Sequence, residues 1–370
     1  MKVVFACAGT GGHINPAIAM ANLIVKKEPD SKVLFIGTED GLENKLVANA
    51  GYEIKHIRTG KIIRQITLKN FTALKNAYKG IGDAKKILDD FKPDLVIGTG
   101  GYICGSVMKA ATKLKIPYVL HESNAFPGVS VKLLAKDAKC VMLGFDAAKD
   151  RIVKSANTVY TGTPAKFSEE DIANLNKEEC LKKLNLDNIN KKIVLITCGS
   201  QGAKRINEVA LSMIKKYLDE DIFYVLVTGD KNYDEVCSLK EEAEKEIGKS
   251  LDKYLRLEKF VFKMDEMYKV ADLCITRAGA MTISELALAH KPSILIPLPT
   301  AAENHQFFNA KVLEEVDAAK IIEQKDLTEE VLNKSVKEII NGKIEEMGEN
   351  AAKVIVKDVE EKIYECIKAK

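Results

Sequence analysis

The sequence predicts an α/β protein made of two doubly wound domains, each with a parallel sheet covered by helices on both faces. In both halves, short runs rich in Val and Ile alternate with longer amphipathic stretches that are typical of helices. A polar, charged segment at residues 161–192 separates the two series. A chain of 370 residues also suits two domains of ordinary size.

The first series of elements starts close to the N-terminus. Its apolar runs end in glycines or polar residues, and helical stretches follow several of them. The expected strands lie at residues 2–8, 32–37, 94–102, 117–123, 138–145 and 157–163, and the expected helices at residues 14–27, 41–50 and 106–115.

The second series repeats this pattern. Its expected strands lie at residues 192–198, 221–229, 255–261, 271–276 and 293–299, with helical stretches between them. We therefore expect an N-terminal domain at residues 1–162 and a C-terminal domain at residues 163–340. A charged helical segment at residues 341–370 is expected to pack back toward the N-terminal domain.

Composition points to a soluble globular protein, with 46% hydrophobic and 29% charged residues. No apolar run approaches the ~18–20 residues that span a bilayer, and the start lacks the features of a secretory signal, so we expect a cytoplasmic protein. Residues 1–165 carry 24 basic against 14 acidic side chains. This excess favours a phosphate-rich or anionic-membrane partner, although lysines that merely solvate helices would give the same count.

The first glycine motif, at residues 8–13, follows a predicted strand and precedes a helix. Glycines allow a tight turn and bring backbone N–H groups close to a ligand. The spacing does not fit a nicotinamide-binding fingerprint. His13 stands at the helix start, where the positive end of the helix disfavours imidazolium and keeps the ring a proton acceptor. A histidine that only caps the turn is the alternative.

Two further motifs of the first half also follow strands. Residues 98–102 form a second glycine-rich loop, and residues 121–124 read His-Glu-Ser-Asn. Polar side chains at a strand end are costly to bury without partners, so they are expected to face a ligand. Tight turns and helix caps are the alternatives here.

The second half contributes three motifs. Residues 199–203 combine glycines with Ser200 before a helix, which suits a diphosphate but lacks the lysine of a P-loop. Residues 277–285 end in Glu285, which can accept hydrogen bonds from ribose hydroxyls, although Thr282 and Glu285 also have the spacing of a capping box. The third motif runs from Pro299 through Asn309 and contains a polar cluster at residues 303–306 after the last apolar run.

Residues Lys61 to Lys92 interleave basic and apolar side chains. This pattern fits a helix bound to an anionic membrane surface, and equally an ordinary amphipathic helix packed on the sheet. We expect no metal site, because the five histidines are dispersed and the Asp-Glu-Asp string at residues 219–221 precedes a strand rather than following one.

In this order, the six motifs resemble those of the MurG family, the glycosyltransferases that convert lipid I to lipid II in peptidoglycan synthesis. The resemblance runs from Lys2 past Ala310. It implies a GT-B fold, with two Rossmann-like domains facing across a cleft. It implies inverting transfer of N-acetylglucosamine from UDP-N-acetylglucosamine to an undecaprenyl-pyrophosphoryl-N-acetylmuramoyl pentapeptide, without cofactor or metal, at the inner face of the bacterial membrane. Within Lys61–Lys92, the segment Ile62–Phe91 occupies the place of the family's membrane-associating patch, and nucleic acid is not an expected partner.

The resemblance also assigns residues. On the N-terminal side the donor sugar would be contacted by Thr10, Gly11, Gly12 and Asn124. The UDP would be held by Lys166, Ser200, Val261, Ala280, Met281, Thr282, Ile283, Ser284, Glu285 and Gln306. Where the family often has Gly-Asn-Pro-x-Arg, this chain ends the motif in Lys166, which keeps the charge but loses the bidentate fork.

Our mechanistic hypothesis is direct displacement at the anomeric carbon, with His13 as the base and Glu122 in reserve. Two rivals stay open. A UDP-N-acetylglucosamine 2-epimerase, or another GT-B transferase with a lipid acceptor, would share fold and donor. A non-catalytic nucleotide-sugar sensor would keep the binding motifs without transfer.

Overall fold

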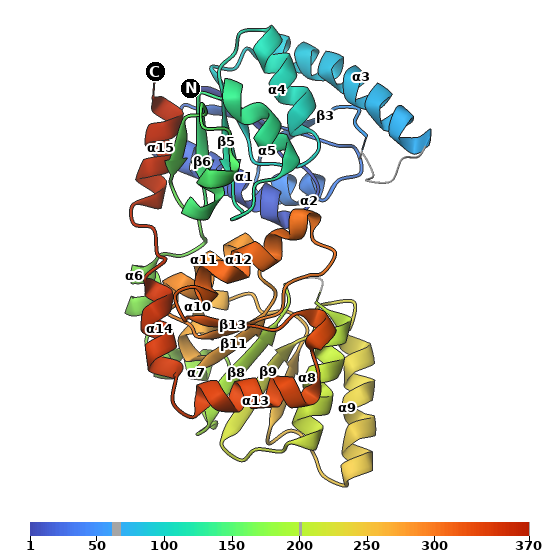
Figure 1. Cartoon of the computed structure of the whole chain (residues 1–370), viewed down its shortest axis with the longest axis vertical. Helices are drawn as coiled ribbons and strands as arrows, with labels where there is room; N and C mark the ends of the chain where they lie inside the picture. The colour runs from blue at the N-terminus through green and yellow to red at the C-terminus, as the bar shows by residue number, and fades with distance from the viewer. Residues whose placement is uncertain (61–67, 200–201, 370) are drawn as a thin grey trace. The chain divides into compact units, whose positions relative to one another are not determined.

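The computed structural model describes residues 1–60, 68–199 and 202–369, with the side chains of residues 68–74 left aside (Figure 1). The chain divides into two compact units. Unit 1 contains Met1–Lys166 together with Val356–Lys370, and unit 2 contains Phe167–Ile355. The sequence predicts the first boundary after residue 162 and a separate segment from residue 341.

Unit 1 is built on a parallel sheet of seven strands with the order β3-β2-β1-β4-β5-β6-β7. Strand β1, between β2 and β4, places Phe5 opposite Phe35 on one side and Ile97 on the other, and the Phe5 and Phe35 rings stack with centroids 5.1 Å apart. The strands are β1 (Lys2–Ala6), β2 (Lys32–Gly37), β3 (Glu53–His56), β4 (Leu95–Gly98), β5 (Tyr118–Glu122), β6 (Cys140–Leu143) and β7 (Thr158–Tyr160).

Alternation along β1 divides the core of unit 1 between two faces. Val4 and Ala6 pack in a cluster with residues of three helices, α3 (Leu68–Phe91), α4 (Cys104–Lys113) and α5 (Val129–Leu134). Val3 and Phe5 point to the opposite face and pack with α1 (Gly11–Lys27), α2 (Leu42–Asn49) and α15 (Val359–Lys368). Buried apolar strands covered on both sides are what a parallel sheet requires.

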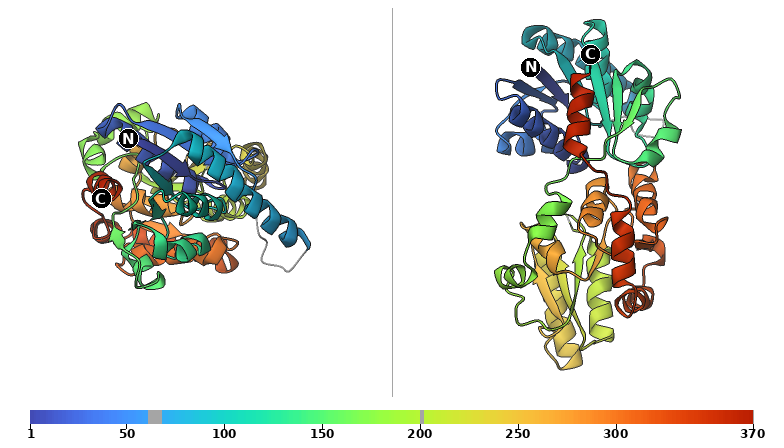
Figure 2. Two further views of the ribbon diagram at one scale, coloured as in Figure 1. Left: turned by 90° about the horizontal axis from the view of Figure 1, so that it is seen from above. Right: turned by 90° about the vertical axis from the view of Figure 1, so that its left-hand side faces the viewer.

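The C-terminal helix α15 completes the core of unit 1. Ile363 and Ile367 are buried against β-strand side chains that come from the opposite end of the sequence. Glu28, at the end of α1, accepts hydrogen bonds from Tyr364 (2.7 Å) and Lys368 (2.8 Å). Figure 2 shows this helix lying beside the N-terminal strands and helices.

Unit 2 has a parallel sheet of six strands with the order β10-β9-β8-β11-β12-β13. The strands are β8 (Lys192–Thr197), β9 (Ile222–Val227), β10 (Leu255–Glu258), β11 (Leu273–Thr276), β12 (Ser293–Leu295) and β13 (Ala319–Ile321). The helices are α6 (Glu169–Asn174), α7 (Lys177–Lys183), α8 (Lys204–Lys216), α9 (Tyr233–Ile247), α10 (Met264–Val270), α11 (Ala280–Leu288), α12 (His305–Glu314), α13 (Glu329–Ile340) and α14 (Ile344–Ala352).

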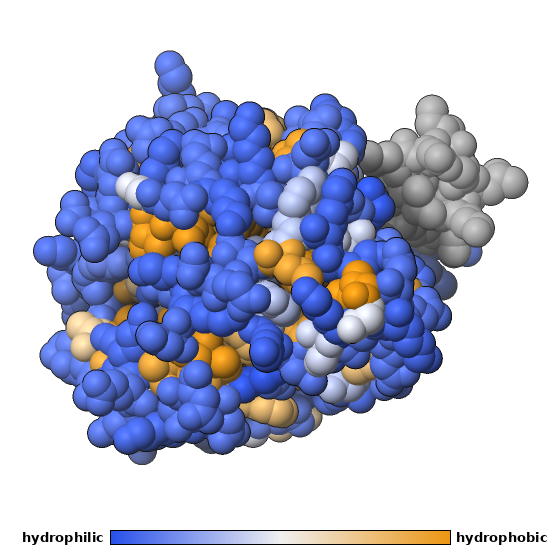
Figure 3. Space-filling view, turned by 90° about the horizontal axis from the view of Figure 1, so that it is seen from below, coloured by the Kyte–Doolittle hydropathy of each residue, from blue (hydrophilic) through white to orange (hydrophobic). Residues whose placement is uncertain are grey.

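The polar segment between the two predicted series contains helices α6 and α7. Ser168 caps α6 in a capping box with Asp171, and the Asn176 side chain caps α7. The surface drawn in Figure 3 is predominantly hydrophilic, with separate hydrophobic areas.

Each sheet reverses its strand order at one point. In unit 1 the chain builds outward from β1 to β3 and then crosses to β4, and in unit 2 it builds from β8 to β10 and then crosses to β11. In open α/β sheets, ligands bind beyond the carboxyl ends of the strands at such a switch point. The loops after β1, β4, β8 and β11 are therefore the candidate ligand-binding loops.

Candidate functional site

In unit 1, the first two glycine motifs meet at the switch point. Gly9, Gly100 and Gly101 have φ values of 103°, 108° and 88°, a region that favours glycine. A Cβ on Gly101 would lie 2.4 Å from the carbonyl oxygen of Ala8. The two loops therefore approach backbone to backbone, which no larger residue at position 101 would allow.

His13 lies in the first turn of α1 and is half-buried. Its Nδ1 is 3.1 Å from the carbonyl oxygen of Thr99, and the Thr99 hydroxyl donates to the His13 carbonyl oxygen at 2.7 Å. A carbonyl oxygen can only accept, so Nδ1 carries the hydrogen and Nε2 of the neutral ring is the acceptor. This tautomer is the one a general base needs.

The start of α1 offers backbone donors. Thr10 occupies the N-cap position, but its side chain makes no capping hydrogen bond. The N–H groups of a first helical turn have no partner within the helix, and the helix dipole adds partial positive charge there. Thr10 and Gly12 are exposed, so this helix end is open to a ligand.

The helices at the switch points differ from other helices at the same sheet edge in the acidic residues of their first turns. None of the four helices that follow β1, β4, β8 and β11 carries an acidic residue in its first turn. Helices α9 and α10, which follow strands of the same sheet edge in unit 2, carry Asp234 and Glu235, and Asp265 and Glu266. The four switch-point helix ends thus lack the carboxylates that would compete with an anionic ligand.

The His-Glu-Ser-Asn motif begins with the last two residues of β5, His121 and Glu122, on the strand next to β4. Burial lowers the pKa of His121 to about 4, so its ring is neutral near pH 7. Glu122 accepts hydrogen bonds from the backbone N–H groups of Asn124 (2.9 Å) and Gly128 (2.8 Å), and from the Asn124 amide (3.0 Å). Burial raises the pKa of Glu122, and these donors act against that shift. Both Glu122 oxygens are engaged in holding this loop, and the contact orients the Asn124 side chain.

In unit 2, the loop after β8 has the same construction. Ser200 and Gln201 lie outside the described residues. On either side of them, Gly199 and Gly202 have φ values of 74° and 67°, and a Cβ on Gly202 would lie 1.8 Å from the carbonyl oxygen of Thr228. The backbone therefore turns tightly into α8, whose N-cap is Ala203.

The loop after β11 shows whether Thr282 and Glu285 form a capping box. Gly279 is the N-cap of α11, so Thr282 stands in the third helical position, and the capping-box reading of Thr282 and Glu285 is wrong. Glu285 instead accepts a hydrogen bond from the Tyr268 hydroxyl at 3.2 Å. The Ile283 side chain is fully buried, so only its backbone could meet a ligand. Ser284 donates to the carbonyl oxygen of Ala280 at 3.3 Å.

Side chains from later in the chain hold these loops together. Arg277 donates to the carbonyl oxygens of Ile296 and Pro297, both at 3.0 Å, and to Gln324 at 2.6 Å. The buried Asn309 donates to the carbonyl oxygen of Ala278 at 3.1 Å. The last sequence motif ends at Asn309, but the sequence alone assigns this residue no role.

The remaining predicted residues occupy different settings. Gln306 accepts from the Leu298 N–H at 2.9 Å, at the end of β12. Val261 is buried just after β10, between the exposed Phe260 and Phe262. Lys166 is exposed and is the last residue of the first segment of unit 1. Met281 is half-exposed in the first turn of α11.

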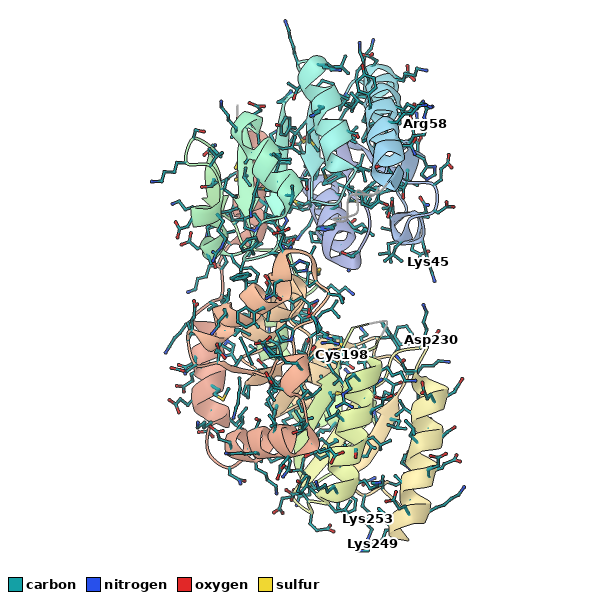
Figure 4. All side chains as sticks on the ribbon, turned by 45° about the vertical axis from the view of Figure 1, so that its right-hand side comes forward. Lys45, Arg58, Cys198, Asp230, Lys249 and Lys253 are labelled. Atoms are coloured by element: carbon teal, nitrogen blue, oxygen red, sulfur yellow. The ribbon has the colours of Figure 1, made fainter. Side chains whose placement is uncertain are left out.

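Figure 4 shows Cys198 and Asp230 at the carboxyl end of the unit 2 sheet, and Lys249 and Lys253 at its opposite end. Within residues 1–60, 68–199 and 202–369, no group of three or more His, Cys, Asp or Glu side chains could hold a metal ion. In the same residues, no helix is long and apolar enough to cross a membrane.

Comparison with known proteins agrees with this layout. Residues 3–143 match the glycosyltransferase family 28 N-terminal domain, and residues 193–363 match the family 28 C-terminal domain. A relative from Acetivibrio thermocellus is 38% identical over 100% of this chain and 98% of its own length. Its name is UDP-N-acetylglucosamine--N-acetylmuramyl-(pentapeptide) pyrophosphoryl-undecaprenol N-acetylglucosamine transferase.

Solved structures give the same picture. The crystal structure of Acinetobacter baumannii MurG is 28% identical, with a TM-score of 0.79 over 100% of this chain and 99% of that one. A UDP-GlcNAc 2-epimerase from Neisseria meningitidis, solved with UDP-GlcNAc, is 16% identical with a TM-score of 0.65 over 99% of both chains. At 16% identity, the similarity to the epimerase shows only that the two proteins share a fold.

Replacing Gly100 tests the packing of the loop against His13. A Cβ at position 100 would lie 2.5 Å from His13 Nδ1, on backbone with a φ of 108°. We expect Gly100→Ala to lower the free energy of unfolding by about 1–3 kcal/mol. The control is Gly105→Ala, in helix α4, where a Cβ would meet nothing within 4 Å. There, alanine is expected to stabilise by about 0.5–1 kcal/mol. If urea unfolding gave the same change in the free energy of unfolding for both variants, the close packing of Gly100 against His13 would be contradicted.

Proposed function

The chain belongs to glycosyltransferase family 28 and, within it, to the MurG family, and on that premise we propose that it transfers N-acetylglucosamine to a lipid-linked acceptor. The donor is UDP-N-acetylglucosamine, and the acceptor is undecaprenyl-pyrophosphoryl-N-acetylmuramoyl pentapeptide. The observation that carries the proposal is the placement of the motifs. Four of the six follow the strands at the two switch points, as a nucleotide-sugar enzyme requires.

In unit 2, the proposed donor site is formed by the loops after β8 and β11. The absence of first-turn carboxylates on α8 and α11 leaves two helix ends to face the diphosphate. Glu285, held by Tyr268, is suited to accept from ribose hydroxyls. Ser200, Val261, Gln306 and Lys166 are the other residues that we assign to UDP by resemblance. Backbone N–H donors at these helix ends would stabilise the negative charge that grows on departing UDP.

In unit 1, the proposed chemistry centres on His13. Its Nε2 would take the proton from the 4-hydroxyl of the acceptor sugar while that oxygen forms a bond to the anomeric carbon of the donor. The bond from this carbon to the UDP oxygen breaks, and UDP leaves with the electron pair. Attack from the opposite side inverts the configuration. The Nδ1 contact with Thr99 supports the role, because it fixes both ring orientation and tautomer.

Glu122 is the weaker candidate for the base. Its two oxygens already accept hydrogen bonds from Asn124 and Gly128, so taking a proton would disrupt the loop that it holds. We assign Glu122 to positioning Asn124, which is expected near the donor sugar together with Thr10, Gly11 and Gly12.

We further propose that unit 1 contacts an anionic membrane, where the lipid-linked acceptor resides. The first part of the predicted patch, residues 61–67, lies outside the described residues. Further along α3, Lys75 and Lys79 are exposed, and Tyr78 between them is 74% exposed. Basic side chains beside an exposed aromatic ring suit a lipid headgroup layer.

The function itself is tested with purified protein, labelled UDP-N-acetylglucosamine and a short-chain analogue of the lipid acceptor. We expect a labelled disaccharide-lipid product, and no sugar product from the donor alone. An epimerised UDP-sugar formed from the donor alone would instead support the epimerase. Binding of UDP without either product would support a sensor.

Replacing His13 tests the mechanism. We expect His13→Ala to lower kcat about 10²–10⁴-fold, because that is the usual contribution of a well-placed base. The Kd for UDP should stay unchanged, since the assigned UDP residues lie outside this loop. His56→Ala is the control, because His56 is an exposed histidine of the same unit. Wild-type turnover in His13→Ala would remove His13 from the role of base.

Replacing lysines on α3 tests the membrane contact. Each lysine near an anionic surface contributes about 1 kcal/mol. We therefore expect Lys75→Gln with Lys79→Gln to weaken binding to phosphatidylglycerol vesicles about 30-fold. The matched control is Lys249→Gln with Lys253→Gln, at the end of the unit 2 sheet opposite Cys198 and Asp230 (Figure 4). Equal loss in both double variants would mean that only net charge matters.

A further inference from the structure

Glu43 is a buried carboxylate that the proposed chemistry does not use. It lies in the first turn of α2, just beyond the carboxyl end of β2, and is 0% exposed. Its Oε1 accepts from the Thr38 N–H (2.9 Å) and the Thr38 hydroxyl (2.7 Å), and its Oε2 accepts from the Gly9 N–H (3.2 Å). In the part of the chain that the structure describes, Glu43 pairs with no lysine or arginine.

The contact with Gly9 reaches across 34 residues of sequence. A carboxylate in a first helical turn often serves its own helix, and the Thr38 contacts at the end of β2 fit that local role. The Gly9 contact does not, because Gly9 belongs to the loop after β1. This loop leads into Thr10, the first turn of α1 and His13.

Two glycines make room for the Glu43 side chain. A Cβ on Gly41 would lie 2.0 Å from Glu43 Oε1, and a Cβ on Gly37 would lie 2.7 Å from Glu43 Cγ. Gly41 has φ −82° and ψ 155°, which any residue adopts. The glycine at position 41 is therefore required by the Glu43 side chain and not by the backbone.

A buried charge held only by neutral donors is costly for the folded state. A glutamine or an apolar side chain of similar size would avoid that cost, so stability alone does not account for this carboxylate. Its contact with the loop that carries His13 offers an account in terms of activity.

We propose that Glu43 is a positioning residue for the transfer reaction: through the Gly9 N–H, it fixes the loop after β1, so that Thr10 and the start of α1 meet the donor sugar and His13 meets the acceptor sugar. This inference rests on the proposed function. Gly9, with a φ of 103°, is a residue with many accessible conformations, and the hydrogen bond to Glu43 selects one. Errors of about 1 Å in such positions cost on the order of 10²-fold in rate.

The first test compares Glu43→Gln with Glu53→Gln, an exposed glutamate of unit 1. Glutamine keeps one acceptor oxygen but turns an NH₂ group toward a donor, so the contact with Thr38 or Gly9 is lost. We expect kcat of Glu43→Gln to fall about 10²-fold. The Kd for UDP should not change, since its assigned residues lie outside this loop, and the free energy of unfolding should be equal to or above that of the wild type. Glu53→Gln should keep wild-type kcat.

The second test is a double-mutant cycle between positions 41 and 43. Gly41→Ala displaces the carboxylate without straining the backbone, so we expect it to lower kcat as Glu43→Ala does. In the Glu43→Ala background, Gly41→Ala should have no further effect on kcat.

Three results would overturn the inference: wild-type kcat in Glu43→Gln, additive losses in the cycle, or a loss of kcat that only follows a loss of stability. A wild-type protein that binds UDP but transfers no sugar would instead refute the proposed function. The two failures are therefore distinct.

Discussion

The structure depends on close backbone contact between neighbouring loops at the carboxyl edges of its two sheets. At this edge Gly101 leaves no room for a Cβ beside Ala8, and Gly202 leaves none beside Thr228. Parallel strands bring their ends to one edge, but only glycine lets two such ends touch and still turn into helices. The same constraint brings helix N-termini close together, because each loop leads directly into a helix. The glycines that allow these loops to pack together therefore also place helix N-termini where an anion could bind.

The positions of the carboxylates distinguish the loops proposed to bind an anionic ligand from the residues that hold those loops in shape. The helices after the four switch-point strands carry no carboxylate in their first turns, whereas Glu43 and Glu122 lie deeper, each already hydrogen-bonded by backbone N–H groups. A carboxylate at a helix end would neutralise the field that an anionic substrate uses. A buried carboxylate that accepts from a loop holds the loop in shape without occupying its outer side. Glu43 and Glu122 thus serve as internal supports, and they leave the exposed donors at the helix starts open to the proposed ligand.

Much of the fold and part of the site could be predicted from the sequence, because the informative patterns are local. Alternating apolar runs and helical stretches gave two parallel sheets, and strand-glycine-helix motifs gave the loops after β1, β4, β8 and β11. The spacing of Thr282 and Glu285 wrongly suggested a capping box, because spacing alone does not show where a helix begins. The N-cap of α11 is Gly279. Glu43 was missed because its partner, Gly9, lies 34 residues away, and Asn309 was given no role because its partner, Ala278, lies 31 residues away. Glu122 was visible as a polar residue at a strand end, but its three donors were not.

The path of the chain adds a constraint that the motifs do not reveal. Unit 2 is one continuous segment, whereas unit 1 needs residues from both ends, since α15 supplies Ile363 and Ile367 to the face covered by α1. Until the last residues are made, that face of unit 1 lacks part of its cover, and exposed apolar surface favours misassembly. Unit 2 can bury its core without waiting for α15. Because α15 follows all of unit 2 along the chain, the last part of the unit 1 core is synthesised after the whole of unit 2.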